Sequence, residues 1–132
     1  MANTIRLTSH LPFITDGELW YFVRWVIEVT EYDEEISSTH VIFRSTEDSN
    51  WSGYARYDIG GERVITISIP AVCRLRFQWK HYRLYTLRNL NEYIIASLAH
   101  ELTHVAKGTI VSEHDSSRTE VATLRKYRRT FQ

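Results

Sequence analysis

The stretch Ser97–Gly108 reads SLAHELTHVAKG. It places two histidines, His100 and His104, four residues apart, with Glu101 directly after the first. The apolar residues around it recur every three or four positions: Leu87, Leu90, Ile94, Leu98, Leu102 and Val105. This spacing predicts a long amphipathic helix over Leu87–Lys107. On such a helix, side chains four residues apart point the same way, one turn from each other.

Two imidazoles directed at one point can serve as two ligands of a tetrahedral zinc ion. Glu101 is rotated by about 100° from His100 around the helix axis, so it can reach a water on the metal without taking a coordination position. Zinc lowers the pKa of its water towards ~7, and a nearby carboxylate can accept the proton as the water attacks a carbonyl. The pattern H-E-x-x-H therefore predicts a zinc site with Glu101 as general base.

A catalytic zinc generally takes three protein ligands, and Glu120 is the first candidate for the third. A predicted helix over Ser117–Phe131 places Glu120 on nearly the same face as Leu124, Tyr127 and Phe131. If that face packs inward, Glu120 points inward as well. A second interpretation is a capping box, in which Ser117 and Glu120 satisfy backbone N–H groups where the helix begins.

His114 is the alternative third ligand, donated from a predicted loop, and Glu113 and Asp115 are further candidates. A second catalytic role, directing a hydrogen-bond donor at a developing oxyanion, could belong to Arg118, to Tyr127, or to His114 if it does not bind the metal. A carboxylate such as Asp115 could orient a ligand histidine through its second ring nitrogen.

The rest of the chain predicts helix and strand segments in a definite order. Apolar spacing predicts a helix over Thr15–Tyr32, begun by Thr15 or Asp16. A β-branched and aromatic run predicts a strand over Thr39–Thr46, and two further arms, Tyr54–Ile59 and Arg63–Ile69, flank a Gly-Gly pair typical of a tight hairpin. The following segment, up to the long helix, holds at most a short extra strand.

This order predicts an α+β fold: an N-terminal helix, a small antiparallel sheet with a hairpin, the H-E-x-x-H helix and a C-terminal helix. The 132 residues suffice for one domain over 1–132. Cys73 is the single cysteine, so no internal disulfide forms, and we expect a reducing, cytoplasmic compartment. The first residues lack a secretory pattern, and the apolar runs are too short to span a membrane.

Charge divides the chain into two halves although its net charge is zero. Residues 1–50 hold nine acids and three bases, whereas residues 51–132 hold seven acids and thirteen bases. The basic residues near the C-terminus are Arg125, Lys126, Arg128 and Arg129. They form either a solvated helix face or a weak contact surface for nucleic acid.

With HELTH at His100–His104 after a hairpin and before a glutamate-bearing helix, the chain resembles the zincin metallopeptidases. It is most similar to the small gluzincins, or minimal zincins. The resemblance implies a zinc-dependent peptidase with His100, His104 and Glu120 as ligands and Glu101 as acid/base. It also implies that an edge strand, either Tyr54–Tyr57 or Val64–Ile69, binds a protein or peptide substrate by strand addition.

The chain departs from some zincin groups. It lacks the third histidine of H-E-x-x-H-x-x-G-x-x-H, and His104 and Glu120 are closer in sequence than in thermolysin-like enzymes. SprT-like proteases share the motif helix and a downstream histidine, a role that His114 could fill, and they act on DNA-bound proteins. The alternative function is a catalytically silent zincin-like domain that binds protein or nucleic acid.

Overall fold

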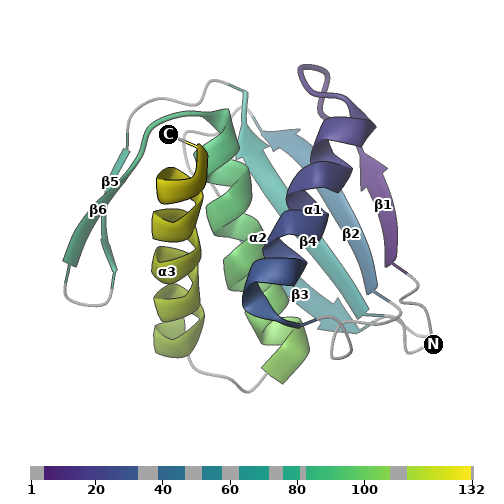
Figure 1. The fold of residues 1–132 in the computed structure, drawn as a ribbon. Coiled ribbons are helices and arrows are strands. Elements are labelled where there is room, and N and C mark those ends of the chain that lie inside the picture. Colours follow the sequence, from purple (N-terminus) through teal and green to yellow (C-terminus); the bar gives the residue numbers. More distant parts are fainter. Residues whose placement is uncertain are drawn as a thin grey trace.

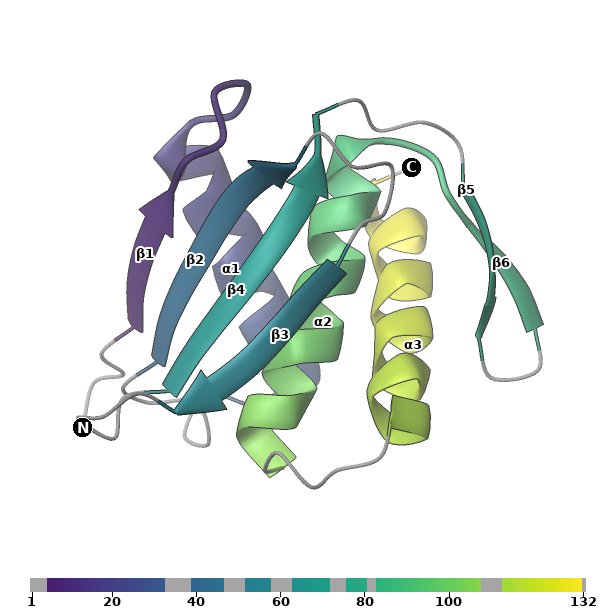
Figure 2. The ribbon, with the colours of Figure 1, turned by 180° about the vertical axis from the view of Figure 1, so that it is seen from behind.

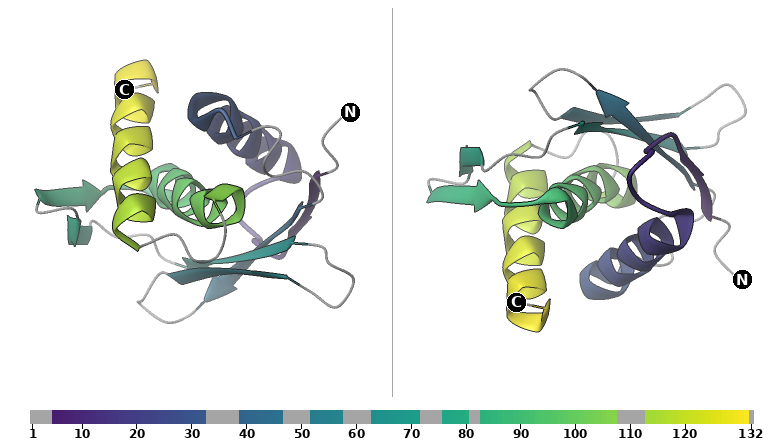
Figure 3. Two further views of the ribbon diagram at one scale, coloured as in Figure 1. Left: turned by 90° about the horizontal axis from the view of Figure 1, so that it is seen from below. Right: turned by 90° about the horizontal axis from the view of Figure 1, so that it is seen from above.

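Helices cover one face of a four-stranded sheet in the computed structural model (Figures 1 and 3). The structure describes residues 5–32, 39–46, 52–57, 63–71, 76–80, 83–107 and 113–131. The elements in chain order are β1 (Ile5–Ser9), α1 (Asp16–Thr30), β2 (Thr39–Thr46), β3 (Ser52–Tyr57), β4 (Arg63–Pro70), β5 (Arg76–Lys80), β6 (Arg83–Leu87), α2 (Leu90–Lys107) and α3 (Glu113–Phe131). The expectation of an α+β fold is confirmed.

Helix α1 forms where the apolar spacing predicts it. Its buried residues are Leu19, Phe22, Val23, Val26 and Ile27. The side chain of Thr15 caps the helix, since its Oγ1 accepts a hydrogen bond from the Glu18 backbone N–H at 3.2 Å. This contact satisfies one of the N–H groups that a helix start leaves without an intrahelical partner.

Replacing Thr15 with alanine should lower the free energy of unfolding by about 1 kcal/mol, because the Glu18 N–H loses its acceptor. Chemical denaturation monitored by circular dichroism measures this. Thr15→Ser is the matched control, as it keeps the hydroxyl and should remain close to the unaltered chain. Equal stability of the alanine and serine variants would contradict the assignment of the cap.

The sheet has the strand order β1-β2-β4-β3, and its first three strands are parallel (Figure 2). The expectation of an antiparallel sheet was wrong for these strands. One reason is β1, which the sequence did not reveal: α1 connects β1 to its neighbour β2, and a crossover helix returns the chain to the same end of the sheet. The other is the place of β3, which follows β2 in the chain but lies beyond β4 in the sheet, so that β4 returns beside β2 in the same direction. Only β3, at the edge, runs antiparallel to its neighbour β4.

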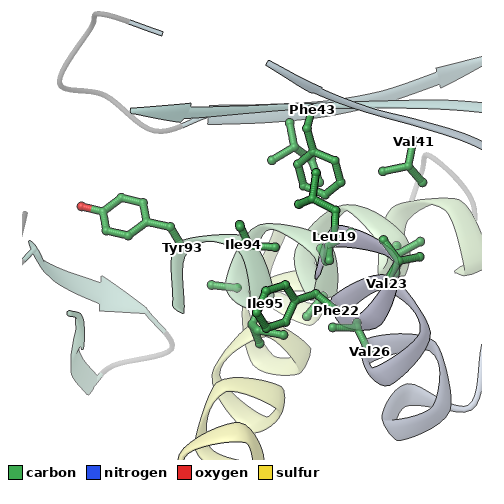
Figure 4. Close-up of a cluster of buried hydrophobic side chains, with 14 of the residues drawn as sticks. Leu19, Phe22, Val23, Val26, Val41, Phe43, Tyr93, Ile94 and Ile95 are labelled. Carbon is green, nitrogen blue, oxygen red and sulfur yellow. The ribbon is translucent and has the colours of Figure 1, made fainter. Parts of the chain in front are cut away.

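Strand β4 lies between β2 and β3, so β3 is the hairpin arm that remains at the edge of the described sheet (Figure 2). The predicted Gly60–Gly61 turn lies outside the described residues. Alternate residues of β2 and β4 face the helices and are fully buried: Val41, Phe43, Ile65, Ile67 and Ile69. They pack with apolar residues of α1 and α2 in the core, some of which Figure 4 shows.

The segment before α2 forms a separate two-stranded antiparallel hairpin, β5 with β6, where at most one short strand was expected. Leu87 ends β6, so the predicted start of the long helix at Leu87 was three residues early. The Asn89 side chain accepts a hydrogen bond from the Glu92 backbone N–H at 3.0 Å, which fixes the start of α2 at Leu90.

The predicted loop before the last helix was too long. Helix α3 begins at Glu113, four residues before Ser117. Ser117 is therefore inside the helix, and the capping-box interpretation of Ser117 and Glu120 was wrong. Their burial has another cause, the packing of α3 against α2. In the described part of the chain, no helix is both long enough and apolar enough to cross a membrane.

Candidate active site

Helices α2 and α3 run antiparallel (Figure 1). They meet through two polar contacts that have the same spacing on each helix. Glu92 of α2 pairs with Arg128 of α3. Eight residues after Glu92, His100 contacts Glu120, and Glu120 lies eight residues before Arg128. Eight residues are close to two helical turns. The residues that form the contacts therefore lie on a single face of α2 and on the single face of α3 that packs against it.

The first contact is a buried ion pair. Glu92 is fully buried, and its two carboxylate oxygens accept hydrogen bonds from Arg128 Nη2 at 2.7 Å and Nε at 3.0 Å. The same carboxylate accepts from the Arg88 backbone N–H at 2.9 Å, and Arg128 also donates to the backbone oxygen of Thr86. Arg128 therefore anchors α3 to the start of α2, a role that its place in the basic run did not suggest.

The second contact holds His100 between two buried glutamates. Its Nδ1 lies 2.9 Å from Oε1 of Glu120, and its Nε2 lies 3.9 Å from Oε1 of Glu101. The side chain of Glu120 is 0% exposed and that of Glu101 is 7% exposed. An ionised carboxylate only accepts hydrogen bonds, so Nδ1 is the donor of this contact when Glu120 is ionised. In the neutral imidazole, Nε2 then carries the lone pair of the ring.

His104 follows one turn further along α2. The centroids of the His100 and His104 rings are 5.2 Å apart, and their planes are inclined by 59°. Both side chains are only partly buried. The two imidazoles that the motif predicts to face one side of the helix therefore lie next to each other, beside the Glu101 and Glu120 carboxylates.

Ser116 is a further polar residue in this region that the sequence did not single out. It lies one turn before Glu120 on α3, so the antiparallel spacing places it at the level of His104. Its Oγ is buried, with no hydrogen-bond partner among the described residues. Buried hydroxyls normally have a partner, so this atom marks a place where a water or a bound group would be stabilised.

The donor chemistry of these residues fits a zinc ion in part. Metal-ligating histidines commonly donate their second ring N–H to a carboxylate, as His100 does to Glu120. Among the residues that the structure describes, however, no three His, Cys, Asp or Glu side chains are arranged to hold a metal ion. In the described conformation, Glu120 contacts the ring nitrogen of a predicted ligand and does not complete a set of three.

The remaining predicted site residues lie elsewhere or outside the described side chains. Tyr127 packs its ring against Trp25 at 5.7 Å and Phe22 at 6.4 Å, on the side of α3 that faces α1. Arg118 is exposed and lines a surface hollow that does not include His100. His114, the alternative third ligand, lies in the first turn of α3, but its side chain is outside the described ones, as is that of Glu113.

Comparisons with known proteins found no match among protein-family models, curated proteins or solved structures. The functional interpretation therefore rests on the residues of this chain and their geometry.

Proposed function

We propose that this chain is a zinc-dependent hydrolase of peptide bonds in which His100 and His104 hold the metal and Glu101 is the general base. The observation that carries the proposal is the position of His100, whose two ring nitrogens face two different buried glutamates one turn from a second imidazole. A lone surface histidine would not require two carboxylates from two helices to be buried beside it.

By accepting a hydrogen bond from Nδ1–H, Glu120 would fix the orientation of the His100 ring and the tautomer that has its lone pair on Nε2, the nitrogen that would bind a cation. Glu101 lies on the Nε2 side of the same ring, where its carboxylate can accept a proton from an attacking water and return it to the leaving amine. A bound zinc would supply the acidity of the water and the polarisation of the carbonyl at this position.

Strand β3 is the element best placed to bind an extended substrate. It is the edge strand of the described sheet beyond β4, and it contacts α2, the helix that carries the motif. An edge strand can hydrogen-bond the backbone of an added peptide strand. Of the two arms considered from the sequence, β4 is paired on both sides and so has no edge to offer.

Metal analysis tests the proposal directly. The purified chain should contain about one zinc per molecule, and His100→Ala and His104→Ala should each lose most of it, because two ligands cannot replace three. His10→Ala is the matched control, since His10 is exposed and remote in sequence from the motif. Retention of zinc by both motif variants would overturn the proposal.

The same measurement on Glu120→Ala and His114→Ala identifies the third ligand. If His114 is the ligand, His114→Ala should lose the metal, and Glu120→Ala should only weaken its binding by about 10–100-fold, the effect typical of a residue that orients a ligand histidine. If Glu120 rotates to bind zinc itself, Glu120→Ala should lose the metal while His114→Ala keeps it.

A further inference from the structure

A surface hollow of about 570 Å³ is lined by residues other than the histidines and glutamates of the candidate active site. It is formed by the C-terminal ends of α1 and α2 together with α3, and Figure 3 shows that α1 and α3 lie on either side of α2. Residues that line it include Val29 of α1, Lys107 of α2 and, on α3, Asp115, Arg118, Lys126 and Arg129. Neither His100 nor Glu120 belongs to it.

The lining of this hollow is strongly basic. Lys107, Arg118, Lys126 and Arg129 line it, against a single acidic residue, Asp115. All four basic side chains are exposed. Since the whole chain has no net charge, this local excess of positive charge is a property of the hollow and would attract an anionic ligand.

The basic residues are spread along α3 and do not converge on one point. Arg118, Lys126 and Arg129 follow the helix over eleven residues, which is about 16 Å of helix axis. A single phosphate or a small anion would contact only one or two of them. An extended polyanion, with a charge repeated along its length, can contact all of them, as nucleic-acid backbones do.

Exposed aromatic rings lie at the end of α3 that follows Arg129. Phe131 is 45% exposed and Tyr21 is 54% exposed, and their ring centroids are 6.2 Å apart. Trp25, one turn before Val29 of the hollow, lies 5.7 Å from Phe131. Basic side chains with exposed aromatic rings nearby are the combination that binds single-stranded nucleic acid, because unpaired bases stack on such rings.

We propose that the hollow between α1 and α3 binds single-stranded nucleic acid, with Lys107, Arg118, Lys126 and Arg129 contacting phosphates and Phe131 and Tyr21 contacting bases. The carboxylates of an acidic peptide would match the charge, but they would not stack on the aromatic rings as bases do. Arg128, which belongs to the same basic run in the sequence, takes no part because it pairs with buried Glu92. The proposal does not depend on zinc or on hydrolysis.

The test is fluorescence anisotropy of the full chain with a labelled oligothymidine of about 12 nucleotides, a length within the usual range of one binding site. Binding should weaken steeply between roughly 50 and 200 mM salt. Lys126→Glu and Arg118→Glu should each weaken binding roughly tenfold at low salt and lower the salt slope by about one. Phe131→Ala should weaken binding and leave the slope unchanged, because stacking displaces no counterions.

Arg125→Glu is the matched control, because this substitution makes the same change of charge on the same helix. Arg125 is exposed and does not line the hollow. It should bind the oligonucleotide nearly as well as the unaltered chain. An equal loss in Arg125→Glu, absence of binding by the unaltered chain at low salt, or equally strong competition by a polyglutamate peptide would each overturn the proposal. Lys126→Gln, with a thermal melt for every variant, separates loss of binding from loss of folding.

Discussion

Glu101→Gln should reduce peptide hydrolysis by about 10²–10⁴-fold while the chain keeps its zinc, because glutamine cannot accept the proton of the attacking water. The carboxylate lies 3.9 Å from Nε2 of His100 and is nearly buried, so little solvent is available to replace it as a base. Glutamine has nearly the same shape, and the histidines should keep their positions. The measurement is the turnover of a quenched fluorescent peptide or of casein, with zinc content determined on the same samples.

The control for this variant is Glu18→Gln, which alters an exposed glutamate of α1 and should leave turnover unchanged. Three outcomes separate the functions. Loss of turnover with zinc retained supports the hydrolase. Unchanged turnover would show that Glu101 is not the base. Zinc without turnover in the unaltered chain would instead favour the catalytically silent zincin-like domain.

Glu92→Ala should lower the free energy of unfolding by about 3 kcal/mol, the lower end of the range for breaking a buried ion pair. The lower end applies because the Arg128 side chain is 21% exposed and regains some hydration. The variant removes the acceptor for Arg128 and for the Arg88 backbone N–H together. Denaturant unfolding followed by tryptophan fluorescence measures the loss.

A double-mutant cycle identifies how much of this loss belongs to the pair. Once Glu92 is alanine, Arg128→Met should cost much less than it does in the unaltered chain, because the charge that it removes no longer has its partner. Arg125→Met, an exposed change on the same helix, should shift stability by less than about 0.5 kcal/mol in either background. Additive effects of Glu92→Ala and Arg128→Met would show that the two residues do not stabilise each other.

Local patterns in the sequence predicted the helices and the central strands well. The spacing of Leu19, Val23 and Val26 identified the buried face of α1, and the run Thr39–Thr46 coincides with β2. The direction of the strands was not predictable in the same way. It depends on β1, whose alternating residues Ile5–Thr8 are too few to identify a strand by themselves, and on the place of β3 beyond β4, which no local pattern determines. A missed strand changes the topology, since it turns α1 from an N-terminal helix into a crossover between parallel strands.

For the candidate site, the motif correctly indicated that His100 and His104 lie on one helix face, and the spacing to Leu124 correctly indicated that Glu120 points inward. The sequence could not show which atom Glu120 meets, because that depends on how α3 packs on α2. The sequence also could not show that Arg128 and Lys126, two residues apart in a basic run, have different environments. Arg128 pairs with buried Glu92, whereas Lys126 is exposed.

The matched spacing of the two polar contacts between α2 and α3 makes these helices intolerant of sliding. A displacement by one turn, about 5.4 Å, would separate Glu92 from Arg128 and His100 from Glu120 in the same movement. It would also bring Leu124, now midway between the two contacts, to the level of a buried carboxylate or an imidazole. A misaligned helix pair would thus lose the arrangement of the candidate site and the buried ion pair together.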